Sequence, residues 1–227
     1  MVPTAEAVAE ALATVPDDAP WTWAALRVLP VIRGDRLQVI EDVELEKMGF
    51  RPTSAFPRVE MDPGIDVTVA IDVDVATMAV DQEMLDRWDM TIERVASVAL
   101  GNLRREVGTW SGSIYTDASY EDIPIRGLEG WPAWATSLLL LPDDLKRLFG
   151  DHDQLFIAPY QCCLLSLPIG VDRDVAADIV DLYGLLNPRS LLIGVPAFVL
   201  RDGGSLRVEA LPGFPDSPDF DAVELPA

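Results

Sequence analysis

The segment from Asp81 to Val107 constrains the fold more than any other part of the chain. Its pattern predicts a short helix, a break at Asp89-Met90 and a longer helix that begins after Thr91. Asp81 and Thr91 suit the N-cap positions, because each is a short polar residue directly before an apolar helical repeat. Gly108 is the expected stop. The predicted buried stripe of the longer helix comprises Ile92, Val95, Ala96, Ala99, Leu103 and Val107. We therefore expect a helix pair whose main task is packing.

A strict two-residue alternation just before the helix pair predicts a half-buried strand. The aliphatic positions are Ile65, Val67, Val69, Ile71, Val73 and Val75. The alternate positions are Asp66, Thr68, Ala70, Asp72, Asp74 and Ala76. Because neighbouring strand residues point to opposite faces, the second set predicts an acidic outer face. We expect Asp66, Asp72 and Asp74 to be the partner-binding residues of this face.

Residues 1–107 are expected to form an N-terminal α+β half. After an amphipathic or Ala-rich first helix, 21–33 and 36–40 have the composition of two strands joined by a hairpin turn at Gly34-Asp35. Residues 45–63 are rich in Pro, Arg and small side chains, which predicts a wrapping loop.

The remainder of the chain has a more regular pattern. Residues 108–134 are expected to be a linker or an ordered loop with a short strand at 113–116, and 211–227 a loose acidic and Pro-rich tail. Residues 135–210 predict a C-terminal half with the order β-α-β-β-α-β-β. Its elements are expected at 135–141, 142–149, 154–158, 162–167, 173–186, 195–201 and 206–210. The predicted class is α+β, a mainly antiparallel sheet with helices packed on one face, in which the two halves form either two units or one domain.

The charge of the chain is strongly one-sided. Its 227 residues include 38 acidic and 17 basic ones, for a net charge of -21. Such a surface repels nucleic acid and anionic membranes, so neither is an expected partner. It favours a basic protein partner, or serves solubility alone. The N-terminus lacks a basic region and no apolar run is long enough to span a bilayer, so we expect a cytoplasmic protein. All basic residues except Lys47 and Lys146 are arginines, which is typical of a GC-rich genome.

Few residues offer catalytic chemistry. Cys162 and Cys163 are adjacent in a predicted strand, where they face opposite ways and are expected to be buried rather than bridged, although a reactive thiol stays open. His152 is the only histidine and lies between two acids in a predicted loop. Asp66, Asp72 and Asp74 are candidate ligands of a divalent cation, with a solvated acidic face as the simpler interpretation. No nucleotide-binding or hydrolase motif is present, and no cofactor is expected.

Two groups of motifs resemble the YtpQ-type family of uncharacterised bacterial proteins. Met84-Leu85-Asp86-Arg87-Trp88, followed by Ala99-Leu100-Gly101-Asn102-Leu103, is similar to the helix pair of that family. Leu155-Phe156-Ile157-Ala158-Pro159, leading into Leu164-Leu165, is similar to its second anchor. The family tends to have an Arg-Asp pair after this proline, whereas this chain has Cys162-Cys163. The resemblance spans roughly Val75 to Leu206. It implies a shared fold more than a shared function, because fold alone does not define function.

Three functions are compatible with the sequence. The leading hypothesis is a non-enzymatic protein that binds a partner through its acidic surface, as an accessory or immunity-type inhibitor. The first alternative is a carboxylate-based or metal-dependent enzyme with a site near Asp72 and Asp74 or near His152. The second alternative is a structural component of a larger assembly. The sequence leaves the identity of the partner and the oligomeric state open.

Overall fold

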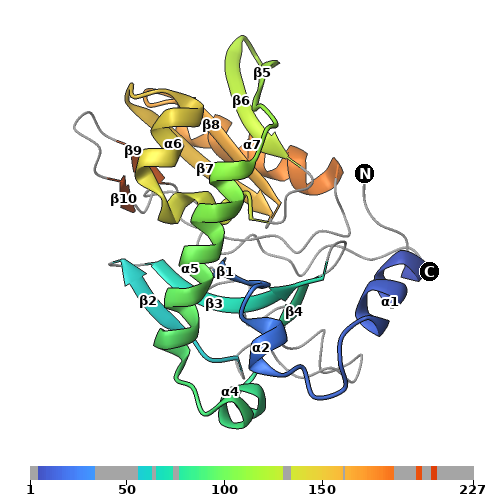
Figure 1. Ribbon diagram of the computed structural model, residues 1–227. Helices are drawn as coiled ribbons and strands as arrows, with labels where there is room; N and C mark the ends of the chain where they lie inside the picture. Colours follow the sequence, from blue (N-terminus) through green and yellow to red (C-terminus); the bar gives the residue numbers. More distant parts are fainter. Residues whose placement is uncertain are drawn as a thin grey trace, which may run out of the picture.

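The structure, a computed structural model, has an α+β fold with two antiparallel sheets, which confirms the predicted class. In Figure 1 the long helix α5 (green) runs alongside both sheets. The structure describes residues 5–33, 56–62, 65–73, 77–129, 134–160, 162–186, 198–200 and 206–208. The predicted strand at 36–40, its hairpin turn and the tail at 211–227 lie outside this part of the chain.

The first sheet is built around β3 (Ile65–Asp72). Strand β1 (Val28–Arg33) pairs with one side of β3, and β2 (Val59–Asp62) and β4 (Thr77–Ala79) pair with the other side. All three pairings are antiparallel, as between Val31 and Thr68. The loop predicted over 45–63 is therefore wrong for its last part, since β2 lies there.

The strand predicted over 21–33 is only half correct. Trp21–Ala24 forms the short helix α2, and β1 begins at Val28. Trp21 packs on Trp88 at a centroid distance of 5.2 Å. The carbonyl of Pro20 also accepts hydrogen bonds from the backbone N–H groups of Trp23 and Ala24. Local hydrogen bonds and this aromatic contact therefore favour a helical turn over an extended strand.

The predicted helix pair is confirmed as α4 (Gln82–Trp88) and α5 (Ile92–Thr109). The Asp81 carboxylate accepts the N–H of Met84 at 2.8 Å, and the Thr91 hydroxyl caps α5 in the same manner. The break between the helices is Asp89, whose φ of 51° is left-handed. Gly108 does not stop the helix, because α5 continues to Thr109. The predicted stripe is buried except for the half-buried Ile92; its buried members are Val95, Ala96, Ala99, Leu103 and Val107. The first helix, α1, spans Ala5–Ala13.

The second sheet has six strands in the order β10-β9-β7-β8-β6-β5. Their bounds are β5 Tyr115–Tyr120, β6 Ile123–Glu129, β7 Gln154–Tyr160, β8 Cys163–Pro168, β9 Phe198–Leu200 and β10 Leu206–Val208. Strands β7 to β10 confirm the predicted C-terminal strands. The hairpin β5–β6 occupies 115–129, a part of the chain for which the sequence predicted a linker or an ordered loop with only a short strand at 113–116. Its polar side chains and a register shift between Tyr115 and Ala118 hide the alternation that identifies a strand.

Two helices contact the six-stranded sheet from opposite faces. Helix α6 (Pro142–Phe149) contributes to the cluster that contains Phe156 and Leu164, and α7 (Arg173–Leu186) to the cluster that contains Ile157 and Leu165. The sequence predicted both helices but placed them on one face. Since the consecutive residues Cys163 to Leu167 of β8 are all buried, other elements must cover both faces of this strand. The strand predicted at 135–141 is instead the 3₁₀ helix η2 (Thr136–Leu140).

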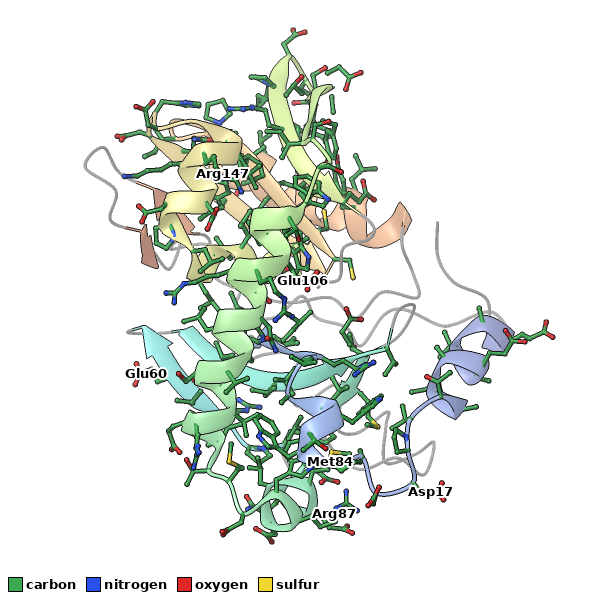
Figure 2. All side chains as sticks on the ribbon, viewed as in Figure 1. Asp17, Glu60, Met84, Arg87, Glu106 and Arg147 are labelled. Atoms are coloured by element: carbon green, nitrogen blue, oxygen red, sulfur yellow. The ribbon has the colours of Figure 1, made fainter. Side chains whose placement is uncertain are left out.

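One apolar cluster joins the two sheets. It contains Leu29 and Val67 from the first sheet, Phe156 and Leu164 from the second, and Leu103 of α5. The hydroxyl of Ser137 in η2 donates to the carbonyl of Pro30 in β1 at 2.6 Å. Arg147 of α6, labelled in Figure 2, donates to the carbonyl of Val107 near the end of α5 at 3.3 Å. One of the three described apolar clusters therefore lies between the two sheets, a second packs the first sheet against α4 and α5, and a third packs the second sheet against α7.

Within the described residues, no helix combines the length and the apolar character that crossing a membrane demands.

Candidate functional site

The outer face of β3 is not the exposed acidic surface that the sequence predicted. Thr68 and Ala70, at its centre, are 2% and 6% exposed, and Asp66 and Asp72 are half-buried. The carboxylate of Asp72 lies close enough to Cys162 to raise the pKa of that thiol. Asp72, the last residue of β3, therefore lies near the turn between β7 and β8. Asp74 lies outside the described residues.

The spacing of Asp66 and Asp72 argues against a shared cation. Six residues along one strand correspond to roughly 20 Å at about 3.3 Å per residue, far beyond the reach of one ion. In the part of the chain that the structure describes, no three His, Cys, Asp or Glu side chains are grouped to hold a metal ion. A site formed by Asp72 together with Asp74 stays a prediction.

Neither Cys162 nor Cys163 forms a disulfide bond. Cys163 is fully buried against α7, whereas Cys162 is half-buried. Burial, and to a lesser degree the Asp72 carboxylate, raise the pKa of Cys162 from 9.0 to about 11. A thiol with such a pKa carries little thiolate at neutral pH, and the thiolate is the nucleophile.

We expect Cys162 to react slowly with iodoacetamide. A pKa of about 11 in place of 9.0 lowers the thiolate fraction at pH 8 roughly a hundredfold. Mass spectrometry of Cys163→Ala protein, native and urea-unfolded, isolates the rate of Cys162. The native rate is expected to keep rising with pH up to about 11. A native rate that levels off near pH 9 would contradict the raised pKa.

His152 belongs to the turn that follows α6 and is exposed. Its backbone carbonyl accepts a hydrogen bond from the side chain of Gln154, which also donates to the carbonyl of Gly150. Gly150 has a φ of 96°, and a Cβ there would lie 2.9 Å from the His152 ring. Arg126 donates to the carbonyl of Phe149 at the end of α6. These contacts give the turn a helix-ending role.

The hairpin β5–β6 has unusual chemistry at its tip. Tyr120 and Ile123 are paired across the two strands, so Glu121 and Asp122 form a two-residue turn. Both turn residues have positive φ, 46° and 66°. Turns of this kind favour Asn-Gly, because a side chain costs free energy in the left-handed region. In Figure 1 the hairpin (yellow-green) extends beyond the rest of its sheet. It therefore presents two carboxylates at an exposed tip.

Carboxylates of α7 lie near this tip. Burial and the neighbouring carboxylates of Asp178 and Glu121 raise the pKa of Tyr120. Asp174 is one helical turn before Asp178 and lies on the same side of α7. Tyr120 is half-exposed, whereas the acidic residues are exposed. We call this set the hairpin–α7 surface; it comprises Tyr120, Glu121, Asp122, Asp174 and Asp178.

A pair of tyrosines connects the hairpin to α7 beneath this surface. The hydroxyls of Tyr115, at the start of β5, and Tyr183, on α7, are 2.9 Å apart. The Tyr115 ring covers Gly127 of β6, where a Cβ would come within 2.3 Å of the Tyr115 hydroxyl oxygen. Burial is the main cause that raises the pKa of both tyrosines, so both hydroxyls stay protonated at neutral pH.

The sequence did not identify the hairpin–α7 surface. Glu-Asp is not a typical hairpin turn, and the acidic residues of α7 look like ordinary solvent-facing positions. The only available signal was the pair of short aromatic and aliphatic segments on either side of Glu121-Asp122. Comparisons with protein-family models, with curated proteins and with solved structures found no match to this chain.

Proposed function

We propose that the protein is a non-enzymatic binding protein whose hairpin–α7 surface docks a basic segment of another protein. The net charge of -21 supports this, since a strongly acidic protein attracts basic partners over a distance. The proposal keeps the acidic binding role inferred from the sequence and moves it from the face of β3 to the hairpin. An accessory or immunity-type inhibitor is a role of this kind.

The observation that carries the proposal is the conformation of Glu121 and Asp122. Each has a left-handed backbone, which costs a residue with a side chain about 1 kcal/mol relative to glycine. Acidic side chains at both positions therefore do not serve the stability of the turn. Residues that are unfavourable for their own backbone conformation are concentrated at functional sites, where the side chain serves binding or catalysis rather than stability.

The chemistry of the surface fits arginine or lysine side chains. Carboxylates of Glu121, Asp122 and Asp178 supply acceptors for charged N–H donors. Tyr120, between the turn and Asp178, offers a half-exposed aromatic ring on which a guanidinium can stack. A planar guanidinium uses both features, so arginine is the better match.

We also place the protein in the cytoplasm. Neither Cys162 nor Cys163 forms a disulfide bond, which is compatible with a reducing compartment.

Replacing the turn by Glu121→Asn with Asp122→Gly is expected to separate stability from binding. Asn-Gly suits the positive φ of both positions, so the free energy of unfolding is expected to rise by about 1 kcal/mol. Binding is expected to weaken, because two of the carboxylates that face the partner are gone. Chemical denaturation measures the first effect. Capture from an extract of the source cells, followed by titration of each captured protein, measures the second.

The matched control is Asp86→Asn with Asp89→Gly, in and directly after α4, the helix that contains Arg87 and that lies at the opposite end of the molecule from the hairpin in Figures 1 and 2. It removes the same charge and also changes a residue of positive φ, since Asp89 has a φ of 51°. A true partner binds the control like the wild type and binds the hairpin variant weakly, with an affinity that falls as salt rises. If every captured protein binds both variants equally, or if none is captured, the proposed surface is wrong.

A further inference from the structure

The hairpin β5–β6 is joined to the body of the protein mainly by one of its ends. Among the described strands, β5 pairs only with β6. Strand β6 pairs with β8 through Arg126–Glu129, so Ile123–Ile125 lie beyond that pairing. Among the described strands none pairs with the tip, so contacts with other elements hold it, whereas Tyr115, opposite Gly127, lies at the end of the hairpin that is paired with β8.

Helix α7 provides these contacts. Tyr115, Ala118 and Tyr120 of β5 pack against the apolar cluster that contains Ala176 and Ile179 of α7. Apolar packing of this kind resists separation but does not define one position, because it is not directional. The hydrogen bond between the Tyr115 and Tyr183 hydroxyls is directional, and its length of 2.9 Å is ordinary for two hydroxyl groups.

We propose that the Tyr115–Tyr183 hydrogen bond is a latch that positions the hairpin on α7, so that the carboxylates of the two elements form one surface. The latch deepens the proposed function and rests on it, because its task is to align the turn with Asp174 and Asp178. Gly127 is part of the latch, since only a residue without a side chain leaves room for the Tyr115 ring. Both tyrosines are positioning residues and need not touch the partner.

Hydrogen exchange in the free protein tests the latch without any partner. Ala118 and Ile125 are opposite each other in the hairpin, and their amides report on its opening. In Tyr115→Phe and in Tyr183→Phe their exchange is expected to accelerate roughly fivefold, the equivalent of one net hydrogen bond. The amide of Val69, in the other sheet, is expected to change less than twofold. The double variant should exchange like either single one, because both changes remove the same bond.

Tyr120→Phe is the matched control. It removes a hydroxyl from the same strand, and that hydroxyl forms no hydrogen bond within the described residues. Unchanged hairpin exchange in both latch variants, equal acceleration in Tyr120→Phe, or effects that multiply in the double variant would overturn the latch. If the capture experiment finds no partner, the proposed function fails, while the exchange rates still decide whether the tyrosines position the hairpin.

Discussion

Phe156→Ala is expected to lower the free energy of unfolding by about 4 kcal/mol, the largest effect of any single change considered for this protein. Phe156 is fully buried in the cluster between the two sheets. Its ring meets that of Phe149 edge to face at a centroid distance of 5.2 Å. Truncation removes the apolar surface of one aromatic ring from the core, leaves a cavity and ends this aromatic contact.

Urea denaturation measures the loss, and hydrogen exchange shows how far it spreads. Because Val67 of β3 belongs to the same cluster, the amides of the first sheet are expected to lose protection together with those of the second. Ile169→Ala, at a residue that is 37% exposed in the same half, is the control and is expected to cost less than about 1 kcal/mol. Loss of protection confined to the second sheet would show that the two sheets are independent.

Asn102→Leu is expected to destabilise the protein by about 3 kcal/mol. Asn102 is 5% exposed, and its Nδ2 donates to the carbonyls of Ala25 and Val28 at 2.9 Å each. Its Oδ1 accepts a hydrogen bond from Arg105. Leucine has a similar volume but no polar side-chain atoms, so the carbonyl of Ala25, before β1, and that of Val28, at its start, lose their donor in a place with little access to water.

Arg104→Leu is the control for Asn102→Leu, because it introduces the same side chain at an exposed position of the same helix. It is expected to change stability by less than about 0.5 kcal/mol. Denaturant unfolding of both variants measures the difference between them. Equal stability of the two variants would mean that water or a shifted backbone satisfies the carbonyls of Ala25 and Val28.

Features with local signals were predicted well. The helix pair α4 and α5 follows from two capping residues and an apolar repeat, all within one short segment. Helices α6 and α7 follow from Pro142 with its two following acids, and from Asp172. In each case the backbone hydrogen bonds lie within the element itself, so neighbouring residues contain most of the information.

Features set by distant contacts were predicted poorly. Alternation along β3 shows which residues share a face, but not that Thr68 and Ala70 lie beneath other parts of the chain. Small side chains of this kind are compatible with water and with burial, so composition does not decide between them. The buried role of Asn102 depends on carbonyls more than 70 residues away in the sequence.

The candidate site shows the same division. The sequence indicated an acidic binding role but assigned it to Asp66, Asp72 and Asp74. The acids of the hairpin–α7 surface come from two segments that only the fold brings together, as the effect of Asp178 on Tyr120 shows. Glu121 and Asp122 both have the left-handed backbone of a turn that favours Asn-Gly. A prediction based on the residue preferences of turns therefore does not identify these two residues.

The cluster between the sheets also has a consequence for synthesis on the ribosome. It combines Leu29 and Ile32, made early, with Phe156 and Leu164, made late. The side of the first sheet that contributes to this cluster therefore stays uncovered until the second half of the chain is made, whereas the cluster that contains Val69 and Leu85 uses N-terminal residues alone. A nascent chain stalled before Leu164 is an incomplete protein that exposes this surface, and chaperones recognise such a surface.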